Sequence, residues 1–309
     1  MSPARSFVTQ SITFDDSGLA ASLNFIHNRS DRNLESLVST LGNRLAYAHY
    51  LWVNPDAKAT VEEFWSQQLC RFSWSKDFEE KVIDIKEYLV RQERRKWMEE
   101  VLRYLPERHS FNTTVYLNLG YDNIVFGENV ALNMSFQQFF MDKRESTYYL
   151  IHELAHAGYV KYHALPTLSN IKTNGELLKV IKYLTHLEGM GVQSALKLRI
   201  SEGGMLDKDY QILFDCKERG MRISRYFRIF DKLRNDVNSK VAMPPIQVFG
   251  KMSGKESRLW YITGCHMAQE IERLHGIETL RKLVKKGSEE FFNEYLDDAY
   301  VTRTAKEQI

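Results

Sequence analysis

The chain has 309 residues, of which 43% are apolar and 12% aromatic, a globular composition that excludes a disordered protein. Its 42 basic and 40 acidic side chains leave a formal net charge of +2, which gives no reason to expect a nucleic-acid or anionic-membrane partner. The N-terminus lacks the apolar core of a signal peptide, no run of about 18 apolar residues occurs, and the three cysteines are far apart, so we expect a cytoplasmic protein with reduced thiols.

The first third of the chain predicts helices. Leucines recur at helical spacing within residues 31–50. A capping-box pattern then opens a second helix, with Thr60 as the N-cap and Glu63 three residues later. Residues 77–105 contain neither glycine nor proline, so we expect one long helix there that ends before Pro106.

Strand-forming residues occur in three stretches. Residues 7–14 favour a short strand. Residues 113–121 and 123–135 are rich in β-branched and aromatic residues and are interrupted by Gly120 and Gly127. We expect two or three short strands in this second region, in a small antiparallel or mixed sheet.

Helical periodicity returns at about Glu145 and continues to the end of the chain, with residues 241–257 as a long loop that contains prolines and glycines. The order of helices, small sheet and helices predicts a mostly helical α+β fold. We divide it into a helical N-terminal region, residues 1–105, and a second region, residues 106–309, and expect the two to pack as one compact unit.

The stretch YYLIHELAHAGY, residues 148–159, contains two histidines four positions apart. On a helix, His152 and His156 lie on one face, so both imidazoles can bind a single ion, and zinc is suited to neutral imidazole. Glu153 lies at the flank of that face, where its carboxylate can reach a water molecule at the ion. This HExxH pattern predicts one zinc ion per chain, with Glu153 as the general base.

A catalytic zinc site needs a third protein ligand, and Glu188 is the first candidate. It is the one carboxylate in a helical stripe of apolar or small residues, where an unpaired charge is costly. The stripe consists of Leu177, Ile181, Leu184, Glu188, Gly191, Ala195 and Leu198. His163 is the alternative ligand, since it would share a face with His156 if the HELAH helix continued. If Glu188 is not a ligand, a buried salt bridge to an arginine or lysine would explain a carboxylate at this position.

These motifs resemble those of the gluzincin clan of zinc metallopeptidases, in which a glutamate on the helix after HExxH completes the metal site. More narrowly, the chain is similar to zinc-dependent proteases of that clan, several of them filed as domains of unknown function. The similarity covers roughly residues 78–296 and is carried by RYLPERHSFNTTVYLNLGY, NIVFGENVALNMS, STYYLIHELAHAGY, LEGMGVQSAL and LWYITGCHMAQEIERLHGIETLRKLV. It implies a zincin-like catalytic region and agrees with Glu188 as a ligand, although Glu188 follows His156 at a longer distance than in the best-known gluzincins.

The resemblance also implies residues that contact the substrate. Tyr261, or His266 as the alternative, would donate a hydrogen bond to the oxyanion of the transition state. The strand that contains Ala131 and Asn133 would lie at an exposed sheet edge above the zinc and bind an extended peptide by strand addition.

The leading hypothesis is a zinc-dependent peptidase that acts on a peptide or protein substrate, without a nucleic-acid or membrane partner. In a second hypothesis the same scaffold binds zinc without cutting substrates, and His163 or His186 completes the coordination as a fourth ligand. In a third, the chain is a helical structural protein that holds no metal. Metal content and a Glu153→Gln variant distinguish these hypotheses.

Overall fold

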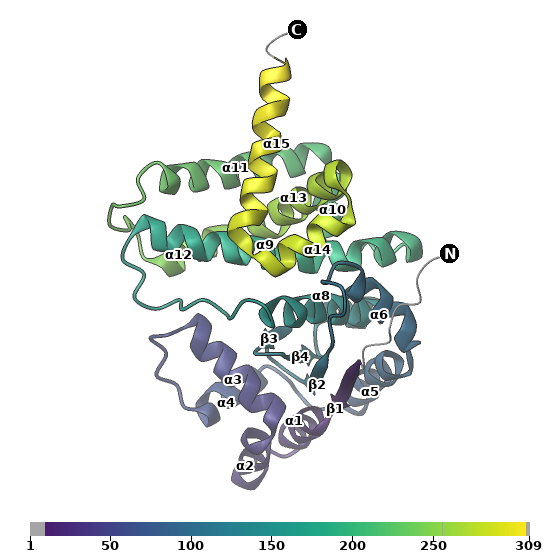
Figure 1. Ribbon diagram of the computed structural model, residues 1–309. Coiled ribbons are helices and arrows are strands. Elements are labelled where there is room, and N and C mark those ends of the chain that lie inside the picture. Colours follow the sequence, from purple (N-terminus) through teal and green to yellow (C-terminus); the bar gives the residue numbers. More distant parts are fainter. Residues whose placement is uncertain (1–9, 255, 307–309) are drawn as a thin grey trace. The chain divides into compact units, whose positions relative to one another are not determined.

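The structure, a computed structural model that describes residues 10–254 and 256–306, confirms a mostly helical α+β fold with a small mixed sheet (Figure 1). Part of the strand expected at residues 7–14 lies outside the described residues, and the described part belongs to strand β1 (Ser11–Asp15). Among the helices described, none is both long enough and apolar enough to cross a membrane.

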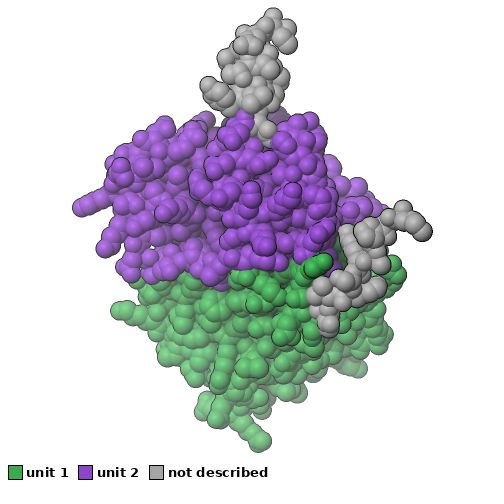
Figure 2. Space-filling model, viewed as in Figure 1, with its two compact units in different colours: residues 1–99, 108–161 green, residues 100–107, 162–309 purple. Residues whose placement is uncertain are grey.

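The chain forms two compact units, which Figure 2 colours separately. Unit 1 comprises residues 1–99 and 108–161, and unit 2 comprises residues 100–107 and 162–309. The division does not follow the boundary expected near residue 105, because the N-terminal helices, the sheet and the HELAH helix all belong to unit 1.

Unit 1 contains the sheet and the helices that cover it. Its strands are β1 (Ser11–Asp15), β2 (Asn112–Asn118), β3 (Ile124–Phe126) and β4 (Asn129–Asn133). Its helices are α1 (Ser17–His27), α2 (Asp31–Ser39), α3 (Leu41–Val53), α4 (Val61–Leu69), α5 (Lys76–Arg91), α7 (Gln137–Met141) and α8 (Arg144–Val160), and α6 (Arg94–Arg103) runs across the boundary to unit 2.

The strand order of the sheet is β1-β2-β4-β3. β2 pairs in parallel with both β1 and β4, and β3 pairs antiparallel with β4. The expected antiparallel or mixed sheet is therefore confirmed as a mixed one, with antiparallel pairing between β3 and β4. One face of the sheet presents Tyr116, Ile124 and Ala131 to Leu45 of α3, and Figure 1 shows α8 on the other side. Helix α8 therefore packs along β3 and β4, the two strands at that end of the sheet.

Three helical expectations are corrected. The helix expected over residues 77–105 is two helices, α5 and α6, and the one expected over residues 31–50 is interrupted at Thr40. The loop expected over residues 241–257 contains a further helix, α12 (Pro245–Ser253), with proline in its first turn, where no backbone donor is needed. The capping box at Thr60 and Glu63 is confirmed at the start of α4.

Unit 2 is a set of helices around the long helix α9 (Asn174–Glu202). The other helices are α10 (Lys208–Phe214), α11 (Cys216–Arg234), α12, α13 (Leu259–His275), α14 (Ile277–Lys286) and α15 (Ser288–Lys306). A capping box of Thr173 and Glu176 opens α9, and Gly203, at φ 67°, ends it. Helices α11, α13 and α15 all contact α9, so α9 forms the core of this unit.

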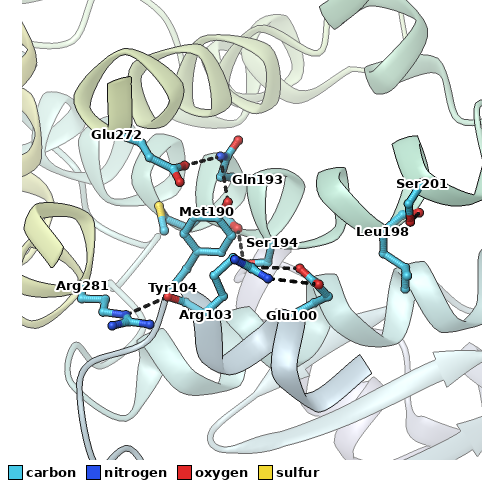
Figure 3. A network of polar contacts seen from close by, with 10 residues as sticks. All are labelled: Glu100, Arg103, Tyr104, Met190, Gln193, Ser194, Leu198, Ser201, Glu272 and Arg281. Carbon is cyan, nitrogen blue, oxygen red and sulfur yellow. Dashed lines mark hydrogen bonds and ion pairs between the residues drawn. The ribbon is translucent and has the colours of Figure 1, made fainter. Parts of the chain in front are cut away.

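The short segment of residues 100–107 is bound into unit 2 by the polar network in Figure 3. Gln193 of α9 donates from Nε2 to the Tyr104 hydroxyl at 3.2 Å and to Oε2 of Glu272 at 2.9 Å. Arg281 of α14 donates from Nε to the backbone carbonyl of Arg103 at 2.8 Å. The end of α6 is thereby tied to α9, α13 and α14.

Candidate metal centre

Helix α8 presents a compact group of metal-binding side chains. The rings of His152 and His156 lie with their centroids 4.4 Å apart and their planes inclined at 66°. One ligand atom from each of His152, Glu153 and His156 can be chosen so that all lie within 4.8 Å of one another. The predicted helical geometry of the HELAH stretch is therefore present, with both imidazoles close enough to reach one ion.

Burial distinguishes the three side chains. Glu153 is 5% exposed and His156 is 4% exposed, whereas His152 is half-buried. Oε2 of Glu153 lies 3.4 Å from Nδ1 of His156, so the carboxylate belongs to the same cluster as the imidazoles. Two imidazole nitrogens are ligands that zinc accepts well, and the carboxylate beside them can act as a base. The residues present thus fit the metal that the motif predicts.

Aromatic rings support the exposed side of the cluster. Tyr149, one turn before His152, packs edge-on against Phe136 and Phe139, with ring centroids at 4.9 and 5.6 Å. Its ring centroid lies 6.4 Å from that of His152. The half-buried imidazole of His152 therefore lies beside the Tyr149 ring, which packs against Phe136 and Phe139.

His49 of α3 is a neighbour of the cluster that the sequence analysis did not identify. Burial lowers the pKa of His49 to about 4, and the nearby charge of His156 adds to the shift. Nδ1 of His49 lies 3.1 Å from the Tyr121 hydroxyl, and its ring is edge-on to Phe126 of β3. No local motif marks this residue, because the fold brings it to the site from a helix far upstream in the chain.

Glu188 lies on α9 in unit 2, whereas the two histidines lie on α8 in unit 1. It is half-buried, while the other members of its stripe are all buried. Within unit 2 the Glu188 carboxylate is close enough to Asp209 to influence its protonation: burial raises the pKa of Asp209, Arg258 opposes the rise, and Asp207 and Glu188 add to it. The role of Glu188 as third ligand stays a prediction.

His163 and His186 are both engaged in the packing of unit 2. Helix α8 ends at Val160, so His163 does not continue the histidine face, and its Nε2 lies 2.9 Å from the backbone carbonyl of Val284. The buried His186 ring stacks on Phe291 with centroids 4.0 Å apart. Burial lowers the pKa of His186 well below its ordinary value. These contacts explain both histidines as part of the packing of unit 2.

The two candidates for the oxyanion donor lie on α13. The ring of Tyr261 is covered by the guanidinium of Arg258, whose Cζ atom lies 3.4 Å from the ring centroid. His266 is half-buried, its ring is edge-on to Tyr295, and burial lowers its pKa. Both the phenol of Tyr261 and a neutral imidazole carry a hydrogen-bond donor, so the choice between the two residues stays open.

The expected position of Ala131 and Asn133 at a sheet edge is wrong. β4 lies between β2 and β3, and Ala131 is paired with Tyr116 on one side and with Ile124 on the other. The sheet edge next to it is β3. With its backbone groups used within the sheet, Ala131 cannot add a peptide strand, so the reason for expecting substrate contacts at these two residues no longer holds.

The side chain of Asn133 has a role within the fold. Its Oδ1 accepts hydrogen bonds from the backbone amides of Gly120 and Ser135, both at 3.0 Å, and from the Ser135 hydroxyl at 2.6 Å. It therefore fixes the turn after β2 to the turn after β4.

Comparison with known proteins gives one match. A family model described as "Putative zinc dependent peptidase (DUF5700)" matches residues 71–300, which is more than half of the chain and includes the HELAH helix and the whole of α9 and α13. No curated protein and no solved structure matches the chain.

Proposed function

The chain belongs to the DUF5700 family, and from this premise we propose that it is a zinc-dependent peptidase that hydrolyses peptide bonds of a peptide or protein substrate. The observation that carries the proposal is the cluster of His152, Glu153 and His156 on α8. Two histidines with a glutamate between them unite metal binding and base catalysis on one turn of helix.

The chain's own residues have distinct roles in the proposed reaction. His152 and His156 would hold the zinc ion, with Glu188 of unit 2 proposed as the third ligand. Zinc held there would supply Lewis-acid chemistry. Glu153 takes the proton from the attacking water and later passes it to the leaving amine. Tyr261 donates a hydrogen bond to the oxyanion, where the charge appears only in the transition state.

Metal stoichiometry by plasma mass spectrometry tests the proposed site. The purified parent should hold about one zinc per chain, and His156→Ala and Glu188→Ala should each lose it. His163→Ala is the matched control, since its imidazole is directed at the Val284 carbonyl within unit 2, and it should keep the metal. A parent without any transition metal, even after zinc is offered, would overturn the proposal.

Cleavage of a mixed peptide library, read by mass spectrometry, tests the activity. New peptide termini that depend on zinc would support a peptidase. A parent that holds one zinc and cuts no peptide would instead support the second hypothesis, a zinc-binding protein without catalysis.

A further inference from the structure

Arg258 opens helix α13 in a conformation that is rare for any residue other than glycine. Its backbone lies in the left-handed region, at φ 48° and ψ 32°. Its N–H donates to the Gly254 carbonyl at 3.0 Å and its carbonyl accepts from the Ile262 N–H at 3.1 Å, so the residue is fixed on both sides. Such strain persists only where the surrounding structure determines it, and it concentrates at functional sites.

The side chain of Arg258 is held by a two-pronged ion pair. Nε donates to Oδ1 of Asp209 at 2.7 Å, and Nη2 donates to Oδ2 of the same carboxylate. Asp209 is buried, and its own N–H donates to Oδ1 of Asp207 at 2.9 Å. A bidentate pair of this kind fixes the plane of the guanidinium as well as its position.

The fixed guanidinium covers one face of the Tyr261 ring, at 3.4 Å from its Cζ atom to the ring centroid. This contact is both a packing contact and a cation–π interaction. Because the tyrosine side chain has only two rotatable bonds, a restraint on its ring plane also restrains its hydroxyl. The ion pair of Arg258 and Asp209 therefore contacts the proposed oxyanion donor directly.

We infer that Arg258 is a positioning residue, which Asp209 anchors and which restrains the ring plane and the hydroxyl of Tyr261 for its proposed role as oxyanion donor. The inference rests on the proposed function, since it gives Tyr261 its task. Arg258 itself contacts neither substrate nor metal in this account. A purely structural ion pair would instead stabilise unit 2 without any specific effect on turnover.

A double-mutant cycle on the zinc-loaded enzyme tests the inference, with a peptide that the parent cleaves as substrate. Arg258→Lys keeps the positive charge but loses the planar fork, and should lower kcat by about 10- to 100-fold with little change in KM. Tyr261→Phe should lower kcat by about 100-fold or more. In the Tyr261→Phe background, Arg258→Lys should have almost no further effect, because the group that it positions is already absent.

Two further variants complete the design. Asp209→Asn releases the guanidinium without removing it and should reproduce the effect of Arg258→Lys, including its absence in the Tyr261→Phe background. Arg103→Lys is the control, because Arg103 pairs with Glu100 elsewhere in unit 2 and should leave kcat unchanged. Zinc content and the thermal midpoint of each variant show whether it is folded.

A readout without catalysis is the fluorine resonance of 3-fluorotyrosine incorporated in place of Tyr261. It should shift in Arg258→Lys and stay in place in Arg103→Lys. The inference would be overturned if Arg258→Lys lowered kcat by the same factor in the parent and in Tyr261→Phe, or if the fluorine resonance did not shift. The peptidase activity of the parent would stand in either case. A parent that binds zinc but cleaves no peptide would overturn the proposed function first and the inference with it.

Discussion

Gly189 of α9 and Gly264 of α13 face one another so closely that the two helices touch through their backbones. A Cβ atom added to Gly189 would lie 2.5 Å from Cα of Gly264, and one added to Gly264 would lie 2.8 Å from Cα of Gly189. Glu188 directly precedes the first glycine, and Tyr261 lies three residues before the second. The contact therefore sets the axial positions of both side chains within unit 2.

Replacement of Gly189 by alanine should destabilise the protein by about 3 kcal/mol or more, because the added methyl group meets backbone atoms that cannot turn aside. The control is Gly220→Ala on α11, where an added Cβ meets nothing within 4 Å. It should stabilise the helix by up to about 1 kcal/mol. Urea unfolding of both variants measures the difference, and equal stabilities would contradict the close contact.

Glu153→Gln should retain zinc and lose about 10²- to 10⁴-fold in kcat, because the amide cannot take the proton of the attacking water. Zinc content and peptide cleavage are measured on the same preparation. Glu128→Gln, at an exposed position of unit 1, should match the parent in both measurements. Full activity in Glu153→Gln would remove the glutamate from the mechanism.

Asn133→Ala should lower the free energy of unfolding by about 2–3 kcal/mol, since the amide and hydroxyl of Ser135 lose their acceptor and the Gly120 amide keeps only the Ser135 hydroxyl. Its KM, measured below the unfolding transition, should equal that of the parent, because the side chain serves the fold. The exposed Asn238 provides a control, and Asn238→Ala should leave stability unchanged. A raised KM at unchanged stability would instead restore the substrate role of Asn133.

The stability of unit 1 should decrease in mild acid because of His109, which is 3% exposed. Burial, with a contribution from the charge of Lys161, lowers the pKa of His109 from 6.5 to about 4. The unfolded chain therefore binds a proton near pH 6.5 that the folded chain binds only near pH 4. Stability is retained above pH 6.5 and is lost as the pH falls through this window. The loss is about 2 kcal/mol between pH 7 and pH 5.

A His109→Gln variant isolates this contribution, since the other histidines titrate alike in both proteins. Its unfolding free energy, measured by urea titration at pH 7 and pH 5, should fall by about 2 kcal/mol less than that of the parent. His27→Gln, at an exposed position, should show the pH dependence of the parent. Identical slopes for His109→Gln and the parent would show that the buried imidazole is not responsible.

Local sequence signals predicted the elements that depend on local chemistry. The capping box at Thr60, the helix that carries HELAH and the α+β class all follow from short-range patterns, and the structure confirms them. The break between α5 and α6 was not predictable from glycine or proline, since neither is present. It follows from a change in the phase of the buried stripe. The stripe of Val82, Ile85 and Leu89 would continue into polar residues, and the next buried residue, Trp97, belongs to a stripe on a different helical face.

The sheet order could not be predicted, because it depends on which distant strands meet. β1 and β2 pair in parallel although helices α1–α6 lie between them in the sequence, and no local pattern reveals this pairing. The pairing of β4 with both β2 and β3 makes it an interior strand and removes the edge expected at Ala131. In the metal-binding cluster, the spacing of His152, Glu153 and His156 was sufficient for a prediction, whereas the position of His49 depends on tertiary contacts that no local pattern reveals.

The path of residues 100–107 has a consequence for any attempt to divide this protein. The chain leaves unit 1 at residue 99, contributes the Tyr104 and Arg103 contacts to unit 2, and returns at residue 108. No single cut releases either unit intact, since a fragment that stops at residue 161 carries away a piece whose partners, Gln193 and Arg281, remain in the other fragment. Exchange of a whole unit therefore needs three matched junctions, after residues 99, 107 and 161.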